Sequence, residues 1–120
     1  MSGELAFFEL GVGDAARGRR FYESLFGWTF SPGPSGGDGG MITTPNVLGG
    51  IHGGDAGASP YLFFRVHDID RAVGKVRELG GSVDGTDIEG DEEVQATYGR
   101  FVLCRDDQGS PFGLYQEPAG

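Results

Sequence analysis

The hydrophobic pattern is clearest between Asp14 and Phe30, where apolar residues recur every three or four positions. This spacing places them on one face of a helix. That face consists of Ala15, Gly18, Phe21, Tyr22, Leu25 and Phe26. Asp14 is a suitable N-cap, and Gly27 suits the left-handed residue that commonly ends a helix. The sequence after Gly27 favours a strand over 28–30. We expect the apolar face of the helix to pack on a sheet.

The same order of elements returns 54 positions later, from Asp14 to Asp68. A strand is predicted over Tyr61–Val66, and Asp68 caps a second predicted helix that ends at Gly80–Gly81. The apolar stripe of this helix consists of Ile69, Ala72, Val73, Val76 and Leu79. The alignment of Asp68 with Asp14 also aligns Arg65 with Gly11. We therefore predict a structural repeat.

The remaining strands complete the two halves. Alternation over Leu5–Val12 places Phe8, Leu10 and Val12 on one face and Phe7, Glu9 and Gly11 on the other. Further strands are expected near 41–44, 47–52, 82–84, 94–104 and 112–116. Glycine-rich composition predicts a loop over 31–40 and a linker over 53–60, and Asp106–Gly109 predicts a tight turn. Each half then has the order β-α-β-β-β.

Composition narrows the class of protein. The 120 residues suit one domain, and 38% hydrophobic with 12% aromatic residues predicts a globular chain. A net charge of −9 argues against a nucleic-acid partner and favours a cationic ligand. Cys104 is the single cysteine, so no internal disulfide forms, and a reducing compartment is expected. No stretch has the length of a membrane span or the pattern of a leader, so we expect a cytoplasmic protein without a membrane partner.

Two β-α-β-β-β units in about 120 residues resemble the vicinal oxygen chelate superfamily, which includes glyoxalase I, bleomycin-resistance proteins and extradiol dioxygenases. The resemblance rests on FYESLFGW at the end of the first helix and on the D-x-x-G turn in GRFVLCRDDQGSPFGLYQ. It implies an α+β fold, in which two tandem βαβββ modules form a cupped open barrel with the helices outside. One glyoxalase-like domain would span 1–120, with modules at about 1–54 and about 60–118. Relatives of this size often form dimers, so a homodimer is left open.

Metal-using relatives keep donors at places that correspond to Phe7, Tyr61 and Gly113 here. Phenylalanine and glycine offer no donor, and a tyrosine phenol is poorly ionised near neutral pH. The fourth place cannot be aligned, although His52 is the one plausible donor nearby. A catalytic divalent site needs three protein ligands, so we expect no inherited metal and no cofactor. The alternative is a relocated metal site at Glu9 and His52. In the simpler interpretation His52 is an ordinary polar loop residue.

Candidate ligand-binding residues share the predicted inner faces of the strands or are aromatic. They are Phe7, Glu9, Trp28, Tyr61, Phe63, Arg65 and Tyr115. Arg65 is expected to face Glu9, either as an ion pair between two partly buried charges or as a recognition pair for a polar ligand group. His67 is expected at the helix entry, and Cys104 as a small buried residue rather than a nucleophile.

Two functions follow from the resemblance and the candidate residues. The first is a small-molecule-binding protein, such as a drug-sequestering protein, whose ligand lies in the cup without an inherited metal. The second is a glyoxalase-like lyase or dioxygenase-like enzyme that uses a displaced metal site or no metal. The sequence assigns no catalytic residue and no substrate.

Overall fold

The computed structural model describes residues 3–33, 38–84 and 92–118. The chain divides into two units, one formed by Phe7–Tyr61 and the other by Met1–Ala6 with Leu62–Gly120. We call these the first and the second unit. The N-terminal residues join the second unit because Gly3 N–H donates to the Arg65 carbonyl and Arg65 N–H donates to the Glu4 carbonyl, each at 2.8 Å.

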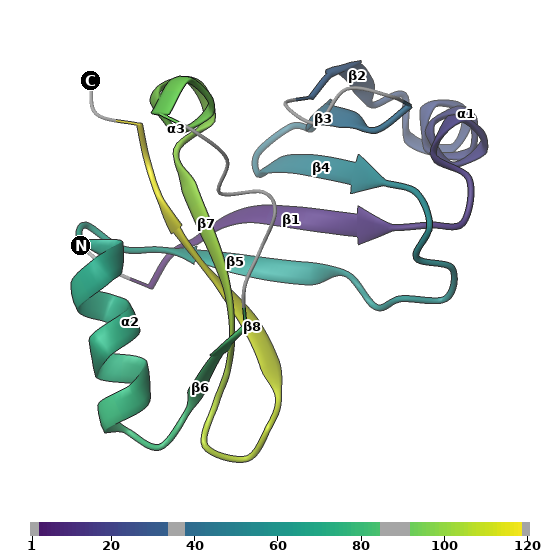
Figure 1. Cartoon of the computed structure of the whole chain (residues 1–120). Coiled ribbons are helices and arrows are strands. Elements are labelled where there is room, and N and C mark those ends of the chain that lie inside the picture. The colour runs from purple at the N-terminus through teal and green to yellow at the C-terminus, as the bar shows by residue number, and fades with distance from the viewer. Residues whose placement is uncertain (1–2, 34–37, 85–91, 119–120) are drawn as a thin grey trace. The chain divides into compact units, whose positions relative to one another are not determined.

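The first unit is a four-stranded sheet with one helix (Figure 1). Its elements are β1 (Leu5–Gly11), α1 (Ala15–Phe26), β2 (Thr29–Pro32), β3 (Gly40–Thr43) and β4 (Leu48–His52). The strand order is β2-β3-β4-β1, in which β3 is antiparallel to β2 and β4, and β1 is parallel to β4. Of the predicted loop over 31–40, residues 34–37 lie outside the described part of the chain.

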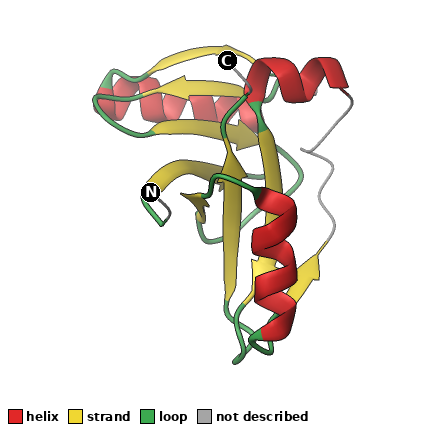
Figure 2. Ribbon diagram, turned by 90° about the vertical axis from the view of Figure 1, so that its left-hand side faces the viewer, coloured by secondary structure: helices red, strands yellow, loops and turns green. Residues whose placement is uncertain are grey.

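The second unit repeats this plan with one additional helix. Its elements are β5 (Tyr61–Arg65), α2 (Ile69–Glu78), β6 (Ser82–Asp84), α3 (Glu92–Tyr98), β7 (Arg100–Arg105) and β8 (Pro111–Gln116). The first residue of β5, Tyr61, is the last residue of the first unit. The strand order is β5-β8-β7-β6, with β8 parallel to β5 and antiparallel to β7. In each unit the long helix lies alongside its own strands (Figure 2). The α+β class is thereby confirmed, and the β-α-β-β-β order holds in the first unit, whereas α3 interrupts it in the second.

Helix α3 corrects the prediction of a strand over 94–104. The strand β7 begins only at Arg100, and the residues before Gly99 are helical. Glu92 and Glu93 occupy the first turn, where negative charge is favourable to the helix dipole. Gly99 ends the helix with a φ of 87°, and its N–H donates to the Gln95 carbonyl at 2.9 Å. The β-branched and aromatic residues that suggested a strand are outweighed by these terminal signals.

Both predicted helix caps are confirmed. Arg17 N–H donates to Asp14 Oδ1 at 3.1 Å, and Arg71 N–H donates to Asp68 Oδ1 at 3.1 Å. Gly27 has a φ of 73° at the end of α1, as the left-handed terminal position requires. The structural repeat inferred from the two aspartates therefore holds at the level of local backbone structure.

Helix α2 packs on its sheet through the stripe expected from the sequence. The buried core of the second unit comprises Ile69, Val102, Cys104 and Leu114, against which Ala72, Val73 and Val76 pack. Burial raises the pKa of the Cys104 thiol, which disfavours the thiolate and agrees with a structural role. Leu79 departs from the stripe, since it ends the helix and is exposed.

Helix α1 does not pack as predicted, because Phe21 is 60% exposed and Leu25 is 58% exposed. The helix approaches its sheet instead through Ala15, which is buried, and through Gly18. A Cβ atom at Gly18 would lie 3.0 Å from Ile51 Cδ1, so the glycine permits the close approach. The expected burial of Phe21 and Leu25 is therefore wrong. Periodicity identified a shared helical face, but Phe21 and Leu25 lie at its exposed edge, whereas Ala15 and Gly18 lie beside the sheet.

No helix among the described residues is both long and apolar enough to cross a membrane.

Candidate functional site

One face of β1 is buried, and it consists of Phe7, Glu9 and Gly11, which the alternation placed together. In the parallel register between β1 and β4, Glu9 is opposite Gly50 and Gly11 is opposite His52. Residues two apart on a strand share a face. Glu9 and His52 therefore project from the same side of the first unit, on neighbouring strands.

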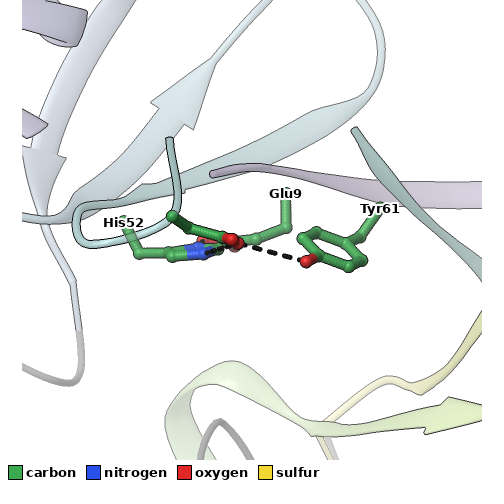
Figure 3. Close-up of polar contacts among 4 residues, drawn as sticks. Glu9, His52 and Tyr61 are labelled. Atoms are coloured by element: carbon green, nitrogen blue, oxygen red, sulfur yellow. Dashed lines mark hydrogen bonds and ion pairs between the residues drawn. The ribbon is translucent and has the colours of Figure 1, made fainter. Parts of the chain in front are cut away.

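Four polar side chains on this side form a continuous chain of contacts (Figure 3). Glu9 Oε2 lies 2.6 Å from His52 Nδ1, and Asp55 Oδ2 lies 2.9 Å from His52 Nε2. The Tyr61 hydroxyl donates to Asp55 Oδ2 at 3.1 Å. We call these four residues the acid–histidine cluster. All four belong to the first unit.

The segment after β4 turns back to bring Asp55 beside His52. Val12 N–H donates to the His52 carbonyl at 2.9 Å, and Asp55 N–H donates to the Val12 carbonyl at 2.9 Å. Between them, Gly54 has a φ of 70° and its N–H donates to the Gly13 carbonyl at 3.0 Å. Because only glycine adopts this backbone conformation without strain, Gly54 allows the sharp return. The glycine-rich linker expected over 53–60 therefore contributes a residue to the site.

The four groups of the cluster shift one another's proton affinities. Burial raises the pKa of Glu9, which is 8% exposed, although the hydrogen bond with His52 opposes this effect. Burial lowers the pKa of His52, but hydrogen bonds to Glu9 and Asp55 outweigh it and leave the pKa raised. The hydrogen bonds with His52 and then Tyr61 lower the pKa of Asp55. An imidazolium that donates to carboxylates on both sides satisfies every one of these contacts.

The exposed edge of the cluster borders a shallow hollow. Its volume is about 580 Å³, and it is lined by Gly13, Asp14, Ala15, Asp38, Gly39, His52 and Gly53. The His52 side chain is 38% exposed and therefore accessible from this side. Asp14 and Asp38 add two carboxylates, while the described lining includes no Lys or Arg. The hollow is therefore acidic.

The residues at the three positions where metal-using relatives carry metal ligands are unsuited to that role in this chain. Phe7 offers no donor atom, and the Tyr61 hydroxyl donates a hydrogen bond to Asp55. At Gly113 a Cβ atom would overlap the ring of Phe63, so no ligating side chain is accommodated there without rearrangement.

The alternative metal pair is brought together, but its members bind each other directly. Glu9 and His52 are in hydrogen-bond contact, and the two ring nitrogens of His52 are directed at different carboxylates. In residues 3–33, 38–84 and 92–118, no group of three or more His, Cys, Asp or Glu side chains converges as metal ligands do. Three converging protein ligands are what a catalytic divalent site requires.

Arg65 has partners other than the one expected. Its Nη1 donates to Glu4 Oε2 at 3.0 Å, and its Nε lies 3.0 Å from Glu117 Oε1 in an ion pair. Glu9 is bound instead to His52. Each charge therefore has a partner within its own unit, and the expected pairing of Glu9 with Arg65 stays a prediction.

Phe63 and Tyr115 lie on the face of the second unit that is turned away from α2. In the strand register Phe63 is opposite Gly113 and Arg65 is opposite Tyr115, whereas Leu114 points to the α2 core. Phe101 packs against both aromatic rings, at 5.4 Å from Phe63 and 4.7 Å from Tyr115 between ring centroids. Their placement on a common face with Arg65 agrees with the alternation in the sequence.

Trp28 lies on the opposite face of the first unit from Glu9. Its ring centroid is 5.6 Å from that of Phe8, and Tyr22 and Phe26 of α1 pack against it as well. Since Phe8 alternates with Phe7 and Glu9 along β1, this aromatic cluster lies on the helix side of the sheet. Trp28 is thus a packing residue and does not join the acid–histidine cluster.

Asp55 is the member of the cluster that was not among the candidate residues predicted from the sequence. It lies within GGDAGASP, whose composition indicated only a linker. The available signal was its position three residues after His52, the one plausible donor in that region.

No family model and no curated protein sequence matches the chain. Solved structures do. A methylmalonyl-CoA epimerase from Mycobacterium tuberculosis is 17% identical with a TM-score of 0.66, covering 98% of this chain and 89% of its own. A glyoxalase/bleomycin resistance protein/dioxygenase superfamily member from Vibrio splendidus is 14% identical with a TM-score of 0.60, covering 92% of this chain and 97% of its own.

A larger protein has the same fold in part of its chain. A variant of homoprotocatechuate 2,3-dioxygenase from B. fuscum is 22% identical with a TM-score of 0.64, covering 98% of this chain but only 33% of its own. At these identities the likeness concerns the fold and not the activity. This chain has the fold of the glyoxalase/bleomycin resistance protein/dioxygenase superfamily, as its resemblance to the vicinal oxygen chelate proteins predicted.

Proposed function

We propose that the protein binds a small molecule through a positively charged group held in the acidic hollow beside His52. The observation that carries the proposal is the composition of this hollow, which Asp14 and Asp38 line together with His52. Behind His52 stand two further carboxylates, Glu9 and Asp55. Carboxylates that converge on a concave surface attract a cationic group, and the net charge of −9 favours the approach of cations to the chain as a whole.

His52 sets the charge that a ligand meets. As an imidazolium it neutralises part of the negative charge of Glu9 and Asp55, and it repels a second cation. As a neutral imidazole it leaves those carboxylates to attract the ligand. A cationic ligand and the His52 proton therefore compete. Binding should strengthen as pH rises through the His52 titration.

The uncharged part of the ligand requires apolar or aromatic surface close to the hollow. Phe7 and Phe63 are buried, which is the usual condition of core aromatics. Tyr61 is only partly buried and its ring centroid is 6.2 Å from that of His52. The Tyr61 ring can therefore support an aromatic or quaternary ammonium group by stacking or cation–π contact. A compact aromatic cation is the ligand class that best combines these features.

A second candidate is an enzyme that transfers protons without a metal. The observation that favours it is the contact between His52 and Glu9, whose burial raises its carboxyl pKa. Buried acids and histidines with shifted pKa values are typical of general acid–base sites. The methylmalonyl-CoA epimerase of the same fold is an enzyme by name, but a shared fold transfers no activity.

Thermal shift and calorimetry with three related probes test the binding proposal. Benzyltrimethylammonium is a permanent cation, benzyl alcohol is neutral and benzoate is an anion. Only the cation should raise the melting temperature, because a ligand that prefers the native state stabilises it by mass action. Asp38→Asn should weaken cation binding, because Asp38 lines the hollow. Asp107→Asn, an equal change of charge on an exposed residue in the other unit, is the matched control. Equal responses to all three probes would reject the proposal.

A further inference from the structure

Two glycines lie directly beneath the carboxylates of the acid–histidine cluster. A Cβ atom built on Gly50 would lie 3.2 Å from Glu9 Cδ and closer still to Glu9 Oε1. A Cβ atom built on Gly11 would lie 2.9 Å from Asp55 Cγ and closer still to Asp55 Oδ2. Carbon atoms of different side chains pack favourably at about 3.5–4.0 Å. Neither carboxylate can keep its position if its glycine acquires a side chain.

Backbone conformation does not account for these glycines. Both lie within strands, where Gly50 is opposite Glu9 and Gly11 is opposite His52. Neither glycine has a positive φ. At the position of the repeat that corresponds to Gly11, the second unit carries Arg65 and is a strand all the same. The strand therefore accepts a long side chain at this position, and the fold alone does not demand glycine.

Other glycines of the first unit have structural roles on the opposite face. A Cβ atom at Gly49 would meet the ring of Phe8, and one at Gly18 would meet Ile51 and Val12. These contacts concern packing between the helix and the sheet. Gly11 and Gly50 differ because the nearest atom to an added Cβ is in each case an oxygen of a carboxylate that holds His52, although Phe7 Cζ also lies 3.0 Å from a Cβ built on Gly50.

We infer that Gly11 and Gly50 are positioning residues. Their lack of a side chain leaves room for the Asp55 and Glu9 carboxylates, which then bind the two ring nitrogens of His52. Each carboxylate occupies space that a Cβ atom on its glycine would fill, and each contacts a different ring nitrogen of His52. This inference rests on the proposed function, because it concerns the residues that set the charge of the proposed ligand site. A merely structural role for the glycines would change stability without changing the state of His52.

The test is the NMR titration of the His52 ring in the ligand-free protein, with His67→Gln used to assign the two histidines. Gly11→Ala and Gly50→Ala should each move the His52 midpoint to lower pH, because one hydrogen-bonded carboxylate is displaced. Gly74→Ala is the control, since Gly74 lies on α2 with nothing within 4 Å of an added Cβ. Its His52 midpoint should equal that of the wild type.

A second substitution distinguishes displacement from unfolding. In Gly50→Ala, the change Glu9→Asp shortens the carboxylate by one methylene and should restore the His52 midpoint towards that of the wild type. If the single alanine variants fold and titrate like the wild type, the inference is wrong. If they lower the midpoint while the wild type binds no benzyltrimethylammonium, the positioning role stands and the proposed function fails.

Discussion

The unequal packing of the two long helices gives a quantitative prediction about stability. Ile69 of α2 is fully buried, at 0% exposure, among Val102, Cys104 and Leu114. Leu25 of α1 is 58% exposed. Truncation to alanine removes three carbon atoms in both cases, so the two variants differ chiefly in the environment that they lose.

The magnitude for Ile69→Ala follows from its burial. Three buried carbon groups at about 0.8 kcal/mol each give roughly 2.4 kcal/mol of lost transfer free energy. The cavity left behind adds to this loss, while the better helix propensity of alanine offsets about half a kcal/mol of the unfolding free energy. The expected decrease in unfolding free energy is therefore about 2–4 kcal/mol. For Leu25→Ala, with most of the side chain already in water, we expect roughly 0.5 kcal/mol or less.

Urea denaturation monitored by circular dichroism measures both values. A transition midpoint that falls strongly for Ile69→Ala and hardly at all for Leu25→Ala, with unchanged slopes, is the expected result. The opposite order, or a Leu25→Ala loss above about 2 kcal/mol, would refute the reasoning. It would show that α1 packs through the face that its sequence periodicity first indicated.

Three further predictions concern the caps, the histidine and the tryptophan. Asp14→Ala and Asp68→Ala should each lower the unfolding free energy by about 1 kcal/mol in denaturant titrations, because each removes a helix cap. The raised pKa of His52 means that the native state holds its proton more firmly than the unfolded state. This stabilisation is complete below about pH 6.5 and is lost as pH rises through the raised native pKa, so His52→Gln should flatten that part of the stability–pH profile measured in urea. Trp28→Leu should cost about 1–3 kcal/mol in thermal or urea unfolding and leave benzyltrimethylammonium affinity unchanged by calorimetry.

Local signals in the sequence were sufficient for the fold class and for the two long helices, but not for α3, which was predicted as a strand. The caps at Asp14 and Asp68, the glycine at 27 and the two-residue alternation of β1 are short-range effects that depend on few neighbours. The packing of α1 depends instead on which edge of the helix meets the sheet, and Gly18 permits a close approach to Ile51, a residue far away in the chain. A cytoplasmic location and a homodimer stay predictions.

The candidate site was predicted only in part. The shared face of Phe7 and Glu9 follows from alternation, and His52 was paired with Glu9 only as an alternative metal site. Asp55 was missed because its place beside His52 depends on the return of the chain at Gly54 and on hydrogen bonds to Val12. The composition of this segment predicts only a flexible linker, and it does not show that the chain returns to Val12.

The affinity of benzyltrimethylammonium as a function of pH tests the central claim most directly. Its charge does not vary with pH, so any change in affinity between about pH 5.5 and about pH 8.5 reports on the protein. If a cation competes with the His52 proton, calorimetry should show binding that strengthens with rising pH in the wild type, and His52→Gln should abolish this dependence. Binding that is absent throughout, or that weakens as pH rises, would contradict the account.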